Sequence, residues 1–194
     1  VGPGEGIALR KLDRRHDHEV ELAVVIGKRA DRVSKEDVLK YVAGYGIGLD
    51  LTIRGPEERS LRKSPDTYTV LGPWMVTADE IPPGAVLTLS CRLNGERMQH
   101  ATTEMLIFKI PRLIAELSLG MTLEPGDIIS TGTPEGVGFA RTPPEFMKPG
   151  DLVDLTVRDF ASVSGTNESQ EMGQRLLDTT TVLKAAQTIS GEIV

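Results

Sequence analysis

The segment EVELAVVIG, residues 19–27, is the part of the chain most typical of a buried β-strand. After Glu21, the β-branched and apolar residues run on to a closing glycine, and this composition favours a strand over a helix. Glu19 and Glu21 lie two residues apart, so a strand would place both carboxylates on one face. The segment therefore predicts a strand that carries two acids side by side.

Other short strands are expected farther along the chain. Residues 86–93 alternate apolar and polar side chains and then turn at Asn94-Gly95, a dipeptide that favours a type I′ hairpin with a return strand directly after it. Residues 127–131 and 152–157 each follow a Pro-Gly-Asp turn and have the composition of short strands. These segments predict several antiparallel pairings.

Helices are expected to be few. Residues 34–44 begin with Ser34 as a possible cap and end at a glycine, and residues 111–120 begin with a proline and also end at a glycine. Residues 170–189 have apolar residues at helix-like spacing. The expected fold class is α+β, rich in β-strand, with few short helices and long loops.

The composition of the chain limits the classes of function. The 194 residues include 22 basic and 28 acidic side chains and have a net charge of −6, which argues against a nucleic-acid-binding protein and permits a cation site. Cys91 is the single cysteine, so no internal disulfide or cysteine-rich zinc site can form, and a cytoplasmic location is expected. No apolar run approaches the ~20 residues of a membrane helix. Because the chain starts at Val1 rather than Met, an N-terminal segment is expected to be missing.

A third acid can join Glu19 and Glu21. Asp50 ends the glycine-rich run GYGIGL, whose glycines suggest close approach of the backbone around a site. Three carboxylates with water would form a suitable site for Mg²⁺ or Mn²⁺, because hard divalent cations prefer oxygen ligands. The alternative is that Glu19 and Glu21 lie on the solvated face of an edge strand.

Positive groups and a glycine-rich loop follow the third acid. Arg54 can form a bidentate contact with a carboxylate, and Lys63 can supply a point charge, although it lies in a basic, loop-like stretch that could be plain surface. Residues 132–138, GTPEGVG, leave an apolar strand and could hold an oxyanion through backbone N–H groups, or form an ordinary turn.

Two further residue types give no clear site. His16 and His18 lack the spacing of a zinc motif, and a flexible, solvent-exposed pair is expected instead. Cys91 lies within the predicted strand 86–93, where a core position is favoured over a nucleophile.

In chain order, these motifs resemble the fumarylacetoacetate hydrolase family. The resemblance is collinear over residues 1–167, and six motifs in order are far more specific than any one of them. The matching segments are 19–27, 45–50, 63–67 with 71–74, 94–96 with Gln99, 123–127 and 131–138.

The resemblance implies a fold, an assembly and a metal site. It implies a mixed β-sheet roll, a homodimer, and Mg²⁺ or Mn²⁺ held by three acids. Glu19, Glu21 and Asp50 stand at the metal-ligand positions, and Lys63 stands at the position of an active-site lysine.

The resemblance also implies substrate contacts. Gln99 and Thr133 stand at positions that contact the oxo-acid end of the substrate, and Arg54 lies close to another such position. Members of the family have an N-terminal lid with a His–Glu pair, and this lid has no equivalent in the sequence. Residues 1–167 are therefore expected to form a catalytic domain without its lid, and residues 168–194 a C-terminal extension.

The implied activity is cleavage of a C–C bond in a 2-oxo or 2,4-dioxo acid. A divalent metal would act as Lewis acid and hold the enolate that forms. The stretch DTYTVLGPW, residues 66–74, favours a decarboxylase or isomerase of aromatic catabolism. An acylpyruvate or fumarylacetoacetate-type hydrolase is the alternative, and a non-catalytic module that binds a metal or an oxo acid is an alternative of another class.

Overall fold

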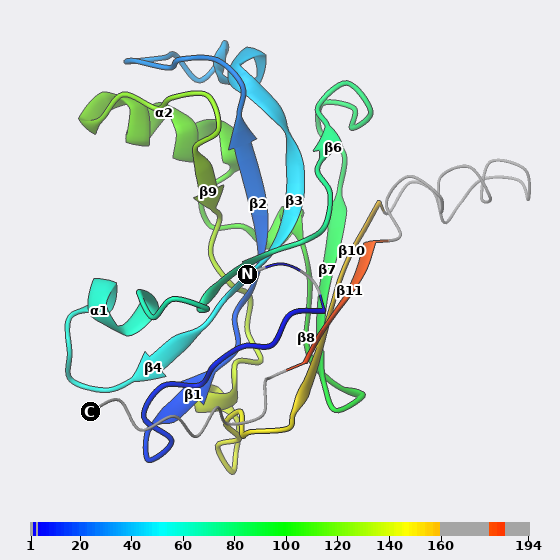
Figure 1. Cartoon of the computed structure of the whole chain (residues 1–194). Coiled ribbons are helices and arrows are strands. Elements are labelled where there is room, and N and C mark those ends of the chain that lie inside the picture. Colours follow the sequence, from blue (N-terminus) through cyan, green and yellow to red (C-terminus); the bar gives the residue numbers. More distant parts are fainter. Residues whose placement is uncertain (1, 3, 160–178, 185–194) are drawn as a thin grey trace, which may run out of the picture.

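The computed structural model describes residues 2, 4–159 and 179–184, and most of its regular structure is β-strand (Figure 1). A five-stranded sheet forms its centre, with the order β5-β3-β2-β9 and with β6 pairing to β3. The strands of this sheet are β2 (Val20–Ile26), β3 (Val42–Asp50), β5 (Thr69–Leu71), β6 (Val76–Thr77) and β9 (Ile128–Ser130).

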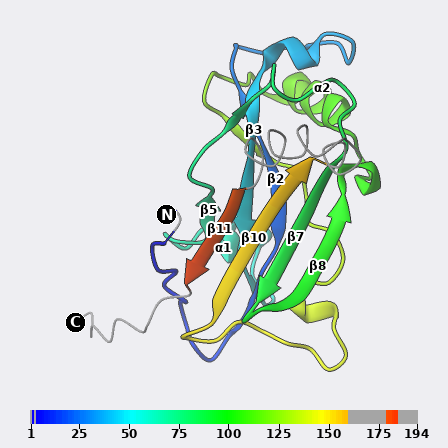
Figure 2. The same ribbon diagram turned by 90° about the vertical axis from the view of Figure 1, so that its right-hand side faces the viewer.

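A second sheet packs beside the first and has four strands in the order β11-β10-β7-β8 (Figure 2). Its strands are β7 (Leu87–Leu93), β8 (Glu96–Thr102), β10 (Leu152–Asp159) and β11 (Thr179–Lys184). A small third sheet pairs β1 (Arg15–Asp17) with β4 (Thr52–Arg54). All strand pairings in the described part of the chain are antiparallel, whereas the family resemblance implied a mixed sheet.

The helices are short and lie outside the sheets (Figure 1). The α-helices are α1 (Arg59–Lys63) and α2 (Ile110–Gly120), and the 3-10 helices are η1 (Val38–Tyr41), η2 (Thr103–Met105) and η3 (Gly138–Ala140). Within the described ranges, none of the helices has both the length and the apolar character that a membrane span requires.

Two apolar clusters hold these elements together. The larger cluster fills the space between the two main sheets, and Leu22 of β2, Leu49 of β3 and Leu155 of β10 are almost fully buried in it. The smaller cluster joins the far end of β2 to helix α2, with Val24 and Ile114 at its centre. Burial of an aliphatic side chain contributes about 1.5–3 kcal/mol, so these contacts fix the strands that carry the acids.

The structure confirms the predicted β-rich α+β class and most of the predicted elements. The strand at 19–27, the hairpin at 86–93 and the helix at 111–120 are present as β2, β7–β8 and α2. Asn94 and Gly95 have φ of 52° and 85°, as a type I′ turn requires. Cys91 is buried in β7, as expected.

Three sequence-based predictions were wrong. The helix predicted at 34–44 is only the 3-10 turn η1, because the chain from Val42 pairs with β2 along the whole of β3. The stretch around Lys63 is helix α1 rather than a loop. The helix predicted at 170–189 is strand β11 over Thr179–Lys184, where it pairs with β10, and the rest of it lies outside the described residues.

The glycine-rich run before Asp50 also has another role than expected. It forms strand β3, and a Cβ on Gly44 would lie 2.2 Å from the carbonyl oxygen of Val76 on β6. Glycine is therefore required there by the close approach of a neighbouring strand and not by a ligand site.

Candidate metal centre

Three carboxylates converge where β2 begins and β3 ends. Glu19 immediately precedes β2, Glu21 is on it, and Asp50 is the last residue of β3. The backbone N–H of Asp50 donates to the Glu19 carbonyl at 3.0 Å. One oxygen from each carboxylate lies within 4.8 Å of the others. Glu19 and Glu21 are buried and Asp50 is half-buried, so these two glutamates do not lie on a solvated edge face.

Two positive side chains contact these acids from one side. Lys63, which α1 positions, donates to Glu19 Oε2 at 2.6 Å and to Asp50 Oδ2. Arg54, at the end of β4, donates through Nη2 to Glu19 Oε1 at 2.8 Å. Burial alone would lower the pKa of Lys63, but the hydrogen bonds and charges of Asp50 and Glu19 raise it above its usual value.

A fourth acid, Asp17, belongs to the same cluster and was missed from the sequence. It is fully buried, and its carboxylate accepts from Arg54 Nε at 2.9 Å and from the backbone N–H groups of Gly138 and Phe139. The alternation of acids at 17, 19 and 21 was a signal that could have revealed it, because alternate residues of an extended chain share a face. A Cβ on Gly138 would lie 1.7 Å from the Glu145 carbonyl oxygen, so a larger residue would displace this loop.

The charges of the cluster fit a divalent cation. Four carboxylates face two positive groups, so with every group ionised the cluster has an excess of two negative charges. Burial, together with the charges of Asp50 and Glu19, raises the pKa of Glu21 to about 7, against the hydrogen bond from Gly132 and the charge of Lys63. Because buried like charges are costly, a divalent cation among these oxygens would stabilise the ionised form of all three ligands.

Gln99 and Thr133 lie beside the acids but are engaged within the protein. Gln99 is buried; its amide oxygen accepts from Val20 N–H, and its amide nitrogen donates to Thr133 Oγ1 at 2.8 Å and to the Pro134 carbonyl. The Thr133 hydroxyl donates in turn to the Val20 carbonyl at 3.0 Å. These bonds fasten the loop at 132–138 to β2.

That loop supplies two backbone donors to the acid cluster, Gly132 to Glu21 and Gly138 to Asp17. The backbone N–H of Gly132 donates to Glu21 Oε2 at 2.9 Å, so the expected contact with an oxyanion is made to a carboxylate of the protein itself. Gly132 has a φ of 96°, which an L side chain rarely adopts.

His16 and His18 are buried, so the expected exposed and flexible pair is a wrong prediction. His16 Nδ1 lies 2.7 Å from the hydroxyl oxygen of Tyr68, and Tyr68 belongs to the larger core cluster. His18 contacts Gln99 through Nδ1 at 3.2 Å, while its Nε2 has no hydrogen-bond partner among the residues that the structure describes. Burial lowers the pKa of both imidazoles, which favours their neutral forms.

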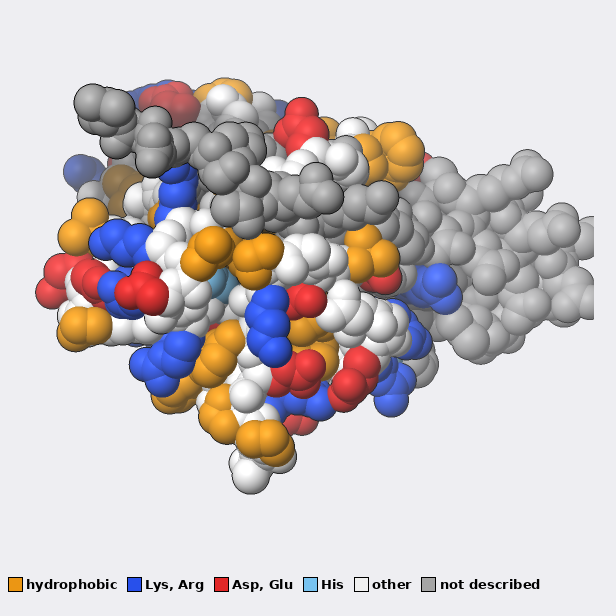
Figure 3. Space-filling view, turned by 60° about the horizontal axis from the view of Figure 1, so that its bottom comes forward, with side chains coloured by type: hydrophobic (Ala, Val, Ile, Leu, Met, Phe, Trp, Pro, Cys, Tyr) orange, Lys and Arg blue, Asp and Glu red, His pale blue; other side chains and the backbone are white. Residues whose placement is uncertain are grey.

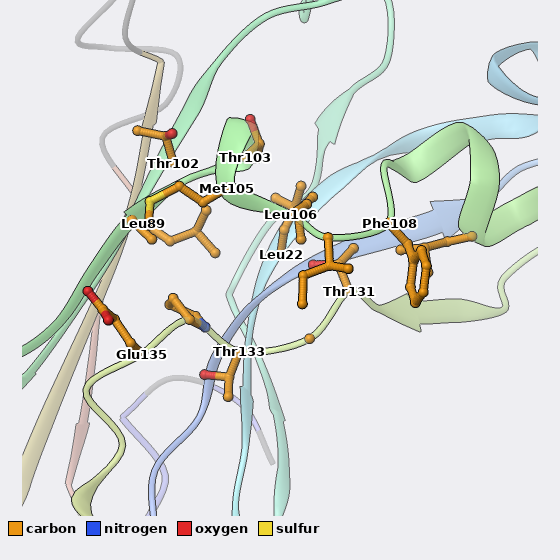
Figure 4. Close-up of a pocket in the computed structure, with 15 residues that line it drawn as sticks. Leu22, Leu89, Thr102, Thr103, Met105, Leu106, Phe108, Thr131, Thr133 and Glu135 are labelled. Carbon is orange, nitrogen blue, oxygen red and sulfur yellow. The ribbon is translucent and has the colours of Figure 1, made fainter. Parts of the chain in front are cut away.

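A cavity of about 370 Å³ lies beside β2, the strand that carries Glu21, and Figure 4 shows the residues that line it. Its wall is mostly apolar and includes Leu22, whose side chain leaves β2 on the face opposite Glu21. Residues 131–135 form another part of the wall, so the stretch whose Gly132 N–H donates to Glu21 also lines the cavity. None of the three clustered acids lines this cavity.

Comparison with known proteins places these features in a family. The family model for the fumarylacetoacetate (FAA) hydrolase C-terminal region matches residues 1–167. A maleylpyruvate hydrolase of Aquipseudomonas alcaligenes is 59% identical over 138 residues, covering 71% of this chain and 48% of that protein. The mitochondrial oxaloacetate tautomerase Fahd2a of Rattus norvegicus is 42% identical over 168 residues, which cover 84% of this chain and 54% of that protein. The chain thus spans about half the length of these curated relatives.

A solved structure has the same fold and contains a metal. The maleylpyruvate hydrolase of Sphingobium sp. SYK-6, in complex with manganese(II) and pyruvate, superposes with a TM-score of 0.77 at 34% identity. The alignment covers 96% of this chain and 60% of that one.

Proposed function

Because the chain belongs to the fumarylacetoacetate hydrolase family, we propose that it is a divalent-metal-dependent enzyme acting on 2-oxo or 2,4-dioxo acids. The observation that carries the proposal is the convergence of Glu19, Glu21 and Asp50 in a cluster with two uncompensated negative charges. The all-oxygen donor set suits Mg²⁺ or Mn²⁺. The Mn(II)-bound relative supports Mn²⁺ as the metal to test first.

Each residue of the cluster then has a distinct role. The bound metal would supply a Lewis acid for the oxo group of the substrate. Lys63 stands beside two of the ligands and is about one quarter exposed, so its ammonium group can reach a substrate and stabilise negative charge that develops on it. Arg54 orients Glu19 and keeps a guanidinium edge near the site, where it can contact a carboxylate.

Gln99 and Thr133 act mainly through the loop at 132–138. Their side chains hold this loop against β2 and so position the Gly132 N–H on Glu21. Their predicted contact with the oxo-acid end of the substrate stays a prediction, as do the homodimer and the cytoplasmic location.

Hydrolysis of a 2,4-dioxo acid is the reaction that we propose first. The relative that is 59% identical is named a maleylpyruvate hydrolase, and this favours attack by water over the decarboxylation or isomerisation preferred from residues 66–74. Tautomerisation is the second candidate, because the relative from Rattus norvegicus is named an oxaloacetate tautomerase. Both reactions pass through an enol or enolate, so the same charge arrangement serves either.

A turnover assay with two substrates separates these candidates. Acetylpyruvate and oxaloacetate are incubated with the protein and Mn²⁺, with and without EDTA, and the enol absorbance and the products are followed by spectrophotometry and mass spectrometry. Acetate and pyruvate from acetylpyruvate indicate a hydrolase, CO₂ from oxaloacetate indicates a decarboxylase, and faster keto–enol exchange without CO₂ indicates a tautomerase. Metal binding without any turnover would contradict the proposal and favour the non-catalytic module.

A further inference from the structure

An unpaired arginine lies at the outer end of the row of acids. Arg15 and Asp17 are alternate residues of β1, so they share a face of that strand, and Glu19 and Glu21 follow them at the start of β2. Arg15 pairs with Arg54 in the β1–β4 register, which places the two side chains next to each other across the strands. The row therefore changes from negative to positive with distance from the cluster.

Arg15 is free to bind a ligand, unlike its neighbours. In the part of the chain that the structure describes, Arg14 is paired with Glu57, and Arg54 with Asp17 and Glu19, but Arg15 forms no ion pair. Arg15 is also exposed. Its guanidinium group lies instead 5.9 Å from the ring centre of Phe139 and 5.7 Å from that of Phe146.

Phe139 connects this arginine to the metal centre. The backbone N–H of Phe139 donates to Asp17 at 3.0 Å. The Arg54 guanidinium lies 5.5 Å from the centre of the Phe139 ring and also donates to Glu19. Phe139 is 52% exposed, so it offers an apolar surface between the two arginines. On this lower face of the molecule, Lys and Arg side chains lie among exposed hydrophobic ones (Figure 3).

We propose that Arg15, supported by Phe139 and Phe146, is the subsite for the distal carboxylate of the substrate. The preferred substrate is then a dicarboxylic oxo acid rather than one with an uncharged tail. This inference rests on the proposed function, which puts the oxo-acid end at Glu19, Glu21 and Asp50. A guanidinium group binds a carboxylate through two parallel hydrogen bonds, and the two rings restrict its motion beforehand.

The distances suit a short dicarboxylic acid. Four residues of chain span at most about 3.3–3.6 Å each, so the Cα atoms of Arg15 and Glu19 lie within roughly 14 Å of each other. Phe139 links the two positions, because its ring is within cation–π distance of Arg15 and of Arg54, and Arg54 donates to Glu19. A short substrate can therefore extend from the acids along Arg54 and Phe139 toward Arg15.

The test compares two non-cleavable 2-oxo acids that differ only at the tail. Binding of 2-oxoglutarate and of 2-oxovalerate to the Mn²⁺-loaded protein is measured by isothermal titration calorimetry for wild type, R15M, R15K and the control R29M. Arg29 is also exposed but pairs with Glu124, away from the acids. We expect wild type to prefer 2-oxoglutarate, and R15M to weaken that ligand about tenfold to 100-fold while leaving 2-oxovalerate within about twofold. R15K should recover part of the loss, and R29M should behave as wild type.

Two results would overturn the inference, and they differ from each other. Equal weakening of both ligands in R15M, or no weakening of either, removes Arg15 from tail recognition while the proposed function stands. Failure of the Mn²⁺-loaded wild type to bind either acid removes the proposed function and this subsite with it. Turnover provides a second readout: R15M should lower kcat/KM for a 2,4-dioxo acid with a terminal carboxylate and spare acetylpyruvate.

Discussion

Replacing Asp17 by Asn is expected to weaken two sets of contacts at once, the ion pair with Arg54 and the hydrogen bonds to the backbone at 138–139. Asp17 is fully buried and accepts three hydrogen bonds of 2.7–3.0 Å, from Gly138 N, Phe139 N and Arg54 Nε. Asparagine keeps one acceptor oxygen and turns an NH₂ group toward donors, so part of this set is lost. Removing one partner of a buried ion pair costs ~3–5 kcal/mol. Arg54 is about one fifth exposed and still has its ion pair with Glu19 in this variant. We therefore expect the free energy of unfolding to fall by about 2–3 kcal/mol.

Denaturant unfolding of D17N, R54M and the double variant measures whether the two residues act as a unit. If Asp17 acts through Arg54, the double variant should be more stable than the sum of the single effects implies, by about 1 kcal/mol or more. D151N is the matched control, because Asp151 also accepts a backbone N–H, from Lys148, but is only half-buried and lies outside the acid cluster. Additive losses within about 0.5 kcal/mol would refute the coupling and leave Asp17 as a loop anchor only.

Three further predictions concern single side chains. K63M should lower kcat by about 10²–10³-fold while Mn²⁺ binding is retained. K28M, which changes an exposed lysine, is the control and should leave kcat unchanged. An unchanged kcat in K63M would exclude Lys63 from the chemistry. Burial raises the pKa of the Cys91 thiol to about 12, so a thiol reagent at pH 8 should react only after unfolding, and rapid labelling of the native protein would contradict its burial. Burial lowers the pKa of His16 below 6.5, so the unfolded state takes up a proton first as the pH falls. The free energy of unfolding should therefore drop below pH 6.5 by up to about 1.4 kcal/mol per pH unit, and H16Q should lose that part of the slope.

The local signals of the sequence were sufficient for the main strands and for one helix. The apolar run after Glu21 and the Asn94-Gly95 turn are decided by neighbouring residues, so β2 and the β7–β8 hairpin could be predicted. Residues 34–44 carry helix-like signals, but pairing of Val42 and the residues after it with β2 overrides them. Such long-range pairing is not visible in a local window.

The candidate site was only partly visible for the same reason. Glu19 and Glu21 lie two residues apart at the start of β2, so their proximity follows from periodicity. Asp50 and Lys63 reach them only through the β2–β3 register and helix α1. Spacing alone left surface roles open for these residues, and the family resemblance selected them. The burial of His16 and His18 could not be derived, because it depends on Tyr68 and Gln99, which lie more than fifty residues away in sequence.

Titration of the protein with Mn²⁺ by isothermal titration calorimetry tests the metal site most directly. The wild type should bind one ion per chain, and E21Q should bind it about tenfold more weakly or worse, because a charged oxygen ligand is lost. E116Q, which changes an exposed glutamate on α2, should bind as the wild type does. Equal affinity in wild type and E21Q, or no binding by the wild type, would contradict a metal site built from Glu19, Glu21 and Asp50.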